Sequence, residues 1–209
     1  MTSVKICGVT TPAALIAARR GGADHVGFVG KEGSPRFISP GECTALSQQA
    51  DGLIRVGLFV DARDEEIRPY LGAIDVLQLH GNESPARAAE LQGRFGRPVW
   101  KALGIRSARD LDAANAYRDV AELILFDAKP PEGAALTGGH GVRFDWSLLD
   151  GWPRRGAWGL AGGLTPANVG RAIAATGAPL VDVSSGVEEA PGEKSAAKIA
   201  AFMEAVKSL

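Results

Sequence analysis

The chain has 209 residues, of which 45% are hydrophobic and 22% are charged, and its formal net charge at pH 7 is -1. This composition is that of an average globular protein with enough apolar material for a sizeable core, so we expect one domain over residues 1–209. Neither half carries the basic excess that binding to a phosphate backbone needs, which argues against a nucleic-acid partner.

The N-terminal segment and the two cysteines predict a cytoplasmic protein without a membrane partner. The chain passes from "MTS" directly into a strand-like run, without a signal-peptide profile. No apolar run reaches the roughly 20 residues that cross a bilayer. Cys7 and Cys43 lack metal-type spacing, and a domain of this size does not need a disulfide, so we expect both thiols to be reduced.

Short runs rich in valine, isoleucine, leucine and phenylalanine recur along the whole chain. Most are nearly continuous, which is typical of parallel strands covered on both faces. The predicted strands are 4–9, 25–29, 53–60, 76–80, 98–103, 122–127, 158–163 and 180–185.

Segments with the start and stop signals of helices separate these runs. In 10–22, Thr11 is a cap, Pro12 lies in the first turn, and glycines end the segment. The segment 165–177 repeats this design with Thr165 as its cap. The other helix-like segments are 39–50, 64–72, 84–96, 107–118, 193–209 and the short 145–151 after the sixth strand.

The alternation of strands and helices predicts the α/β class and a single (βα)8 TIM barrel with a closed, parallel, eight-stranded sheet. A doubly wound open sheet has the same alternation and is the structural alternative. In a barrel, the chemistry takes place at the carboxyl ends of the strands. The residues that end each apolar run are therefore the candidate site residues.

Two motifs follow the seventh and eighth strands, where barrels often bind a phosphate. "LAGGLTP" contains Gly162 and Gly163, and "VDVSSGV" contains Ser184, Ser185 and Gly186. Glycines let backbone N–H groups approach phosphate oxygens closely, and serine hydroxyls add donors. Two tight turns are the structural alternative, but both motifs at these two strands favour a phosphate site.

Cys7 and Asp127 end the first and sixth runs, so a barrel places them at the same rim. A buried carboxyl group can stay protonated near neutral pH and act as a general acid. A thiolate is a competent base but needs a nearby positive charge, for which Lys5 and Lys101 are candidates. The residues alone leave open whether Asp127 merely caps a turn and Cys7 packs as a small apolar side chain. Cys43 is expected in the core.

Three further side chains near the predicted rim suit a substrate or remain structural. Arg36 follows the second strand between Pro35 and Phe37, and arginine suits a planar carboxylate, although a solvated loop arginine is the alternative. His80 ends the fourth strand and either faces the mouth or is structural. His140 lies in a long loop that could act as a lid. The scattered histidines predict no metal site.

Taken together, "KICGVT", "SPRFIS", "LQLHG", "FDAKPPEG", "GGHGVRFDW", "LAGGLTPANV" and "VDVSSGVE" resemble the motifs of the phosphoribosylanthranilate isomerases, in the family's order. The resemblance runs from residue 4 to about residue 190. It implies a (βα)8 barrel of tryptophan biosynthesis. The implied reaction is the Amadori rearrangement of N-(5-phosphoribosyl)anthranilate to 1-(2-carboxyphenylamino)-1-deoxyribulose 5-phosphate, without a cofactor.

The resemblance also implies a role for each candidate residue. Cys7 would be the general base and Asp127 the general acid. Arg36 would hold the anthranilate carboxylate, and the substrate would be a small phosphorylated molecule, with no obligatory protein partner. The remaining implied residues are His80 and Asp182 as substrate contacts, and Gly162, Gly163, Ser184, Ser185 and Gly186 at the phosphate. His140 departs from the family pattern.

Two other classes of function stay open at this point. One is a different phosphate-binding barrel enzyme, such as an indole-glycerol-phosphate synthase or a flavin-using oxidoreductase. The other is a non-catalytic phosphate-sensing barrel, which would have no need for Cys7 or Asp127. The related isomerase of histidine synthesis acts on a substrate with a phosphate at each end. Here the third and fourth strands end in "FVDAR" and "QLHGN", which predict no second phosphate site.

Overall fold

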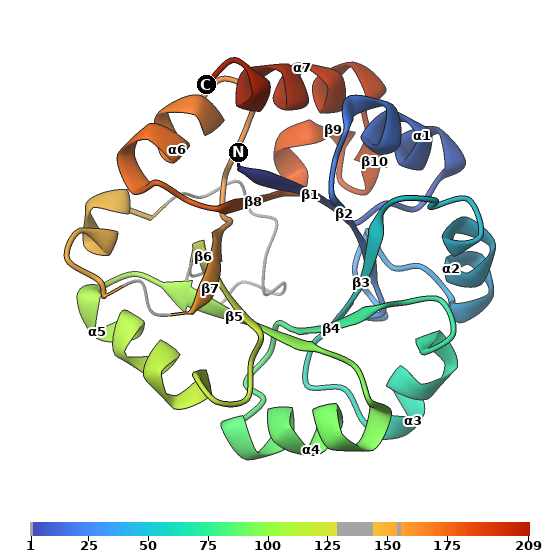
Figure 1. Cartoon of the computed structure of the whole chain (residues 1–209). Coiled ribbons are helices and arrows are strands. Elements are labelled where there is room, and N and C mark those ends of the chain that lie inside the picture. Colours follow the sequence, from blue (N-terminus) through green and yellow to red (C-terminus); the bar gives the residue numbers. More distant parts are fainter. Residues whose placement is uncertain (1, 129–143, 154–155) are drawn as a thin grey trace.

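The computed structural model describes residues 2–128, 144–153 and 156–209. Within them, eight parallel strands close into a barrel in sequence order (Figure 1). The barrel strands are β1 (Ser3–Cys7), β2 (His25–Val29), β3 (Ile54–Phe59), β4 (Val76–Leu79), β5 (Val99–Ile105), β6 (Leu123–Ala128), β7 (Ala157–Leu160) and β8 (Leu180–Val183). Each predicted run overlaps one of them, so the barrel is confirmed and the open sheet is excluded.

Helices form an outer ring around the barrel (Figure 1). The α-helices are α1 (Pro12–Gly21), α2 (Pro40–Ser47), α3 (Asp64–Ile67), α4 (Pro85–Phe95), α5 (Ala108–Asp112), α6 (Val169–Thr176) and α7 (Ala196–Lys207). The 3₁₀ helices are η1 (Arg68–Tyr70), η2 (Ala113–Tyr117), η3 (Trp146–Leu149) and η4 (Ser185–Val187). None of the described helices combines the length and the apolarity that crossing a bilayer requires.

Local signals set where two of these helices begin. The Thr11 side chain accepts a hydrogen bond from the Ala14 N–H at 3.3 Å and caps α1, as predicted. The prediction that Thr165 caps the next such helix is wrong, because α6 begins at Val169. The Asn168 side chain instead accepts from the Thr165 N–H at 2.8 Å and donates to the Gly163 carbonyl at 2.9 Å. These bonds hold the start of the segment as a turn.

An apolar cluster fills part of the barrel interior, and its side chains come from the strands except Ala161, which directly follows β7. This cluster consists of Val56, Val76, Trp100, Ala102, Leu123, Leu125, Ala161 and Leu180. A larger core lies between the barrel and the helices and includes Cys43, which is fully buried in α2 as predicted. The packed interior leaves room for a pocket toward the carboxyl ends of the strands, where barrels carry their chemistry.

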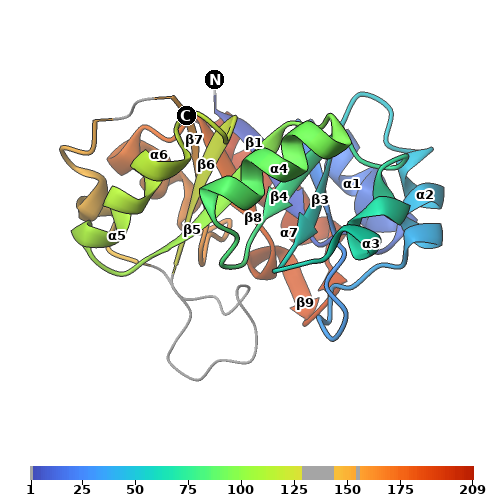
Figure 2. The same ribbon diagram turned by 90° about the horizontal axis from the view of Figure 1, so that it is seen from below.

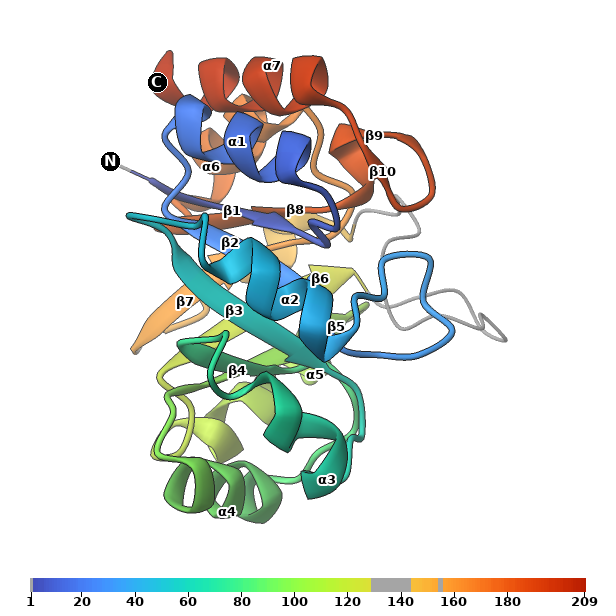
Figure 3. The ribbon, with the colours of Figure 1, turned by 90° about the vertical axis from the view of Figure 1, so that its right-hand side faces the viewer.

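A small antiparallel hairpin follows η4 and was not predicted. It consists of β9 (Glu188–Ala190) and β10 (Glu193–Lys194). The sequence interpretation assigned residues 193–194 to the C-terminal helix, but α7 begins only at Ala196, after a cap by Ser195. Figures 2 and 3 show the hairpin and the loop after β2 projecting from the same end of the barrel, opposite the two chain termini.

Candidate active site

A pocket of about 270 Å³ opens at the carboxyl ends of the barrel strands. All of the predicted site residues line it except Gly186. They come from both halves of the chain, since β1, β2, β4, β6, β7 and β8 each end at this rim. The predicted site residues that line the pocket are Cys7, Arg36, His80, Asp127, Gly162, Gly163, Asp182, Ser184 and Ser185.

Cys7 ends β1 and is buried at the floor of this pocket. Burial raises the pKa of the Cys7 thiol, and the neighbouring Lys5 ammonium opposes that rise. The Ser184 hydroxyl donates to the Cys7 carbonyl at 3.1 Å and ties the end of β1 to the loop after β8. The thiol is thus held at the pocket, and its use as a base depends on the charge beside it.

Asp127 reaches the pocket from the end of β6 and lies in a chain of polar contacts. Its Oδ1 accepts from the Ala128 N–H at 2.7 Å, and its Oδ2 lies 3.1 Å from His80 Nε2. Gln78 Nε2 lies 3.1 Å from His80 Nδ1. With the Gln78 amide as donor, the His80 ring carries its proton on Nε2 and donates to the carboxylate. His80 and the Ala128 N–H thus each direct a donor at the Asp127 carboxylate.

Arg36 is buried beneath the mouth of the pocket and is held by Glu188. Its Nε and Nη2 donate to the two Glu188 oxygens, each at 2.8 Å. Lys194 forms a second ion pair with Glu188. Burial alone would raise the pKa of Glu188, but the hydrogen bonds from Arg36 and Lys194 bring it below its ordinary value. Two cations sharing one carboxylate leave one positive charge for an anionic ligand.

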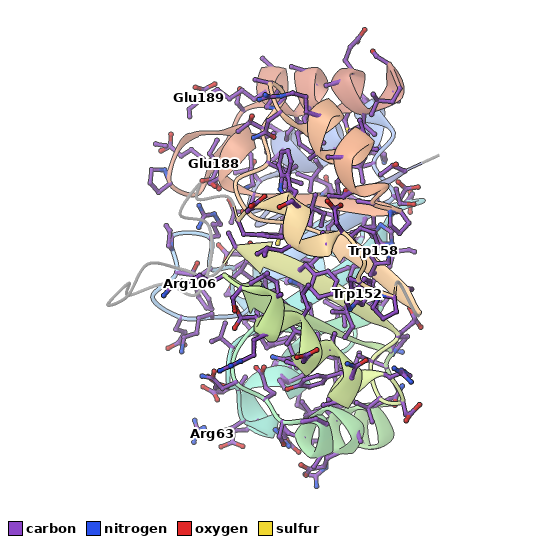
Figure 4. The ribbon with its side chains drawn as sticks, turned by 90° about the vertical axis from the view of Figure 1, so that its left-hand side faces the viewer. Arg63, Arg106, Trp152, Trp158, Glu188 and Glu189 are labelled. Carbon is purple, nitrogen blue, oxygen red and sulfur yellow. The ribbon has the colours of Figure 1, made fainter. Side chains whose placement is uncertain are left out.

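Glu188 and Lys194 are functional candidates that the sequence interpretation missed. Glu188 ends the quoted motif "VDVSSGVE", yet nothing local links it to Arg36, and Lys194 was assigned to a helix. Figure 4 shows Glu188 toward one end of the barrel and Trp152 and Trp158 toward the other.

The bidentate pair of Arg36 with Glu188 leaves Arg36 Nη1 and one Nη2 proton for a ligand, which permits a planar carboxylate to bind.

Glycines at three positions allow the backbone to pack closely around the site. Gly8 has φ +75°, and a Cβ there would lie 2.7 Å from Arg36 Cδ, so the residue after Cys7 must be small for Arg36 to lie over it. Gly162 has φ +84°, and a Cβ there would overlap the Ala128 N atom. A Cβ on Gly186 would overlap the Leu164 carbonyl. Gly186 thus brings the loops after β7 and β8 together without lining the pocket.

Asp182 lies in the pocket wall on β8, next to Lys5. Its Oδ2 accepts from Lys5 Nζ at 3.0 Å, while its buried Oδ1 has no hydrogen-bond partner in the described part of the chain. Lys101 points away from the pocket, because its Nζ donates to the Gly81 carbonyl at 2.6 Å and to Glu83 at 2.9 Å. Of the two candidate lysines, only Lys5 therefore lies beside Cys7.

The ends of β3 and β4 lie across the barrel from the loops after β7 and β8, and their amides are already occupied. Glu83 accepts hydrogen bonds from the N–H groups of Asp61 and Gly81, at 2.7 and 2.9 Å. Asp61 in turn accepts from the Asn82 N–H at 2.6 Å. Carboxylates of the chain itself fill this edge, which disfavours a second phosphate there. His140 lies outside the described residues.

Comparison with known proteins places this geometry in one family. The model of the family described as N-(5'phosphoribosyl)anthranilate (PRA) isomerase matches residues 4–205. The chain is 51% identical over 204 residues to the N-(5'-phosphoribosyl)anthranilate isomerase of Paracoccus denitrificans, covering 96% of this chain and 95% of that protein.

Solved structures agree with the sequence comparison. The phosphoribosyl anthranilate isomerase of Thermotoga maritima superimposes with a TM-score of 0.89 at 37% identity, over 100% of both chains. A phosphoribosyl anthranilate isomerase solved in complex with reduced 1-(o-carboxyphenylamino)-1-deoxyribulose 5-phosphate gives a TM-score of 0.86 at 35% identity, again over 100% of both chains. The pocket described above thus lies in a chain that belongs to the N-(5'-phosphoribosyl)anthranilate isomerase family of tryptophan biosynthesis.

Proposed function

We propose that residues 1–209 form one isomerase domain whose pocket binds N-(5'-phosphoribosyl)anthranilate, with Cys7 as general base and Asp127 as general acid. The observation that carries the proposal is that both residues line one pocket, which also holds Arg36 and the glycine-rich turn after β7. The test is whether the purified protein, with no cofactor added, consumes this substrate and forms the ketose product.

The proposed reaction moves one proton onto the substrate and removes another. Asp127 protonates the ring oxygen of the ribose, and the ring opens as the C–O bond breaks and the nitrogen lone pair forms an iminium. The Cys7 thiolate then removes the proton from the neighbouring carbon, which gives an enolamine that tautomerises to the ketone. The product is an isomer of the substrate, and the sulfur forms no covalent bond.

The charge distribution of the pocket supports one orientation of this substrate. The phosphate would lie at the glycines after β7 and the serines after β8. There the lack of a glycine side chain would let backbone N–H groups come close to the phosphate oxygens. The anthranilate carboxylate would accept from the free edge of Arg36. Asp182 Oδ1 and His80 would contact the sugar between them. Such a substrate carries a single phosphate.

The proposed setting is the cytoplasm, with a small phosphorylated molecule as the partner and neither nucleic acid nor a second protein required. The two cysteines support a reducing compartment, because both are unpaired and buried. The near-zero net charge also speaks against a nucleic-acid role.

We expect Arg36→Met to raise KM for N-(5'-phosphoribosyl)anthranilate by about one to two decades with a smaller effect on kcat. The reason is the loss of a charged hydrogen bond to a carboxylate, which is worth roughly 1.5–3 kcal/mol. Steady-state kinetics on the purified variant measures both constants. Arg63→Met is a matched control, since the Arg63 side chain is 70% exposed and lies outside the pocket. An unchanged KM in Arg36→Met would remove Arg36 from the binding site.

A further inference from the structure

We propose that Lys5 is a positioning residue that acts through Cys7: its ammonium group, held in place by Asp182, stabilises the thiolate and so raises the fraction of Cys7 that is available as a base. This inference rests on the proposed function, because a base is needed only if Cys7 removes a proton from the substrate. It accounts for the lysine of "KICG" as part of the catalytic apparatus and not only of the core.

The strand register places the three side chains together. Lys5 and Cys7 are two residues apart on β1, so both side chains point to the same face of the strand. Closure of the barrel pairs β1 with β8 and sets Lys5 opposite Asp182, where Nζ and Oδ2 are 3.0 Å apart. The ammonium is therefore fixed by a partner from the other end of the chain.

Gly27 on β2 provides the space in which the ammonium and the thiol meet. It lies opposite Cys7 in the register of β1 and β2. A Cβ on Gly27 would lie 2.8 Å from Cys7 Sγ and 3.1 Å from Lys5 Nζ. Both atoms thus border the same small volume, and any side chain at this position would separate or displace them.

Burial makes this contact strong. Lys5 is fully buried, and Cys7 and Asp182 are nearly so. Two charges that lie close together interact strongly at such sites, because little water is present to screen their interaction. Burial would lower the pKa of Lys5, but Asp182 and Cys7 outweigh it and raise that pKa, so the lysine stays charged. The pKa of Cys7 lies above its ordinary value because burial raises it most; Lys5 opposes that rise, and Asp182 adds to it more weakly.

The other charged groups around Cys7 do not replace Lys5. Lys194 on β10 lowers the pKa of Cys7 to a smaller extent, and it shares the Glu188 carboxylate with Arg36. Burial lowers the pKa of His25 on β2, and the Lys5 charge lowers it further, which keeps this ring neutral near pH 7. Asp127 lines the same pocket and carries no positive charge.

The test measures the ionisation of Cys7 directly, by the pH dependence of its alkylation with iodoacetamide. The full-length protein carries Cys43→Ala, so that Cys7 is its single thiol. The rate of alkylation rises with pH as the thiol ionises, and the pH at half of the maximal rate is the midpoint. We expect Lys5→Met to raise this midpoint by about one pH unit or more, since an adjacent opposite charge has effects of this size. We expect Asp182→Asn to lower the midpoint, because it removes a negative charge and leaves the ammonium.

Opposite shifts from the two halves of one ion pair distinguish an electrostatic role from a structural one. The double variant Lys5→Met/Asp182→Asn removes both charges, leaves no unpaired buried ion, and should have a midpoint between those of the single variants. Circular dichroism shows which variants are folded. If Lys5→Met does not fold, the Asp182→Asn and double variants still decide the matter, since the double variant must titrate above Asp182→Asn.

The second measurement is kcat/KM for isomerisation as a function of pH. The kcat/KM of Lys5→Met should fall by about tenfold at pH 7 for each unit that the midpoint rises, and it should recover as the pH is raised. Midpoints that do not move, or that move in the same direction in both single variants, would overturn the inference. A protein without isomerase activity whose midpoints shift in opposite directions would contradict the proposed function and leave the charge assignment intact.

Discussion

Replacing Cys7 with alanine should lower kcat by a factor of about 10² to 10⁴ while the substrate still binds, because a positioned base contributes about that much to a proton transfer. The Cys7 side chain lies on the floor of the pocket, and its removal leaves Arg36 and the loops after β7 and β8 in place. Proton removal from carbon would then depend on water, which is a weaker base than a thiolate and is not held in position. The loss should therefore appear in kcat and much less in KM.

Steady-state kinetics on the purified variant measures this effect. Cys43→Ala is the matched control, since it makes the same substitution at a buried cysteine in α2, outside the pocket. The control should keep near wild-type kcat even if it loses some stability. A Cys7→Ala variant with near wild-type kcat would show that Cys7 is not the base.

Replacing Asp127 with asparagine should produce a loss of the same order in kcat. Asparagine has nearly the same shape and can still accept a hydrogen bond from the Ala128 N–H, but it has no proton to give to the ribose ring oxygen. Ring opening then lacks its acid, so the first step of the reaction slows. His80, which now faces an amide, keeps its place in the pocket wall.

Asp75→Asn is the control for this substitution. Asp75 precedes β4 at the opposite end of the barrel, where it pairs with Arg55. This control should be fully active. Retention of wild-type kcat in Asp127→Asn would assign the acid to another group. In the double variant with Cys7→Ala, the two losses need not multiply, because the residues act in one reaction sequence.

Much of the fold could be predicted because the signals are local. Continuous apolar runs mark parallel strands that are buried on both faces, and each run coincides with a strand. Thr11 with Pro12 defines the start of α1 in the same way. The prediction of Thr165 as a cap failed because the hydrogen bond from Asn168 to the Gly163 carbonyl, which the local pattern does not indicate, accompanies a turn before α6.

The parts of the candidate site that were missed or left open depend on contacts between distant residues. Glu188 holds Arg36 across 152 positions of the sequence, and Lys5 meets Asp182 across 177. Only the closure of the barrel brings these pairs together. The hairpin of β9 and β10 has few residues and no apolar pattern, so nothing in it indicated that Lys194 would face the site.

The most direct measurement is the loss of the fluorescence of N-(5'-phosphoribosyl)anthranilate when the purified protein is added without cofactor. A parallel assay offers an aminoaldose with a phosphate at each end, which the carboxylate-filled ends of β3 and β4 should exclude. We expect rapid, catalytic loss of fluorescence with the first substrate and little ketose formation from the second. Unchanged fluorescence would contradict the isomerase assignment, and comparable turnover of both substrates would contradict the single-phosphate site.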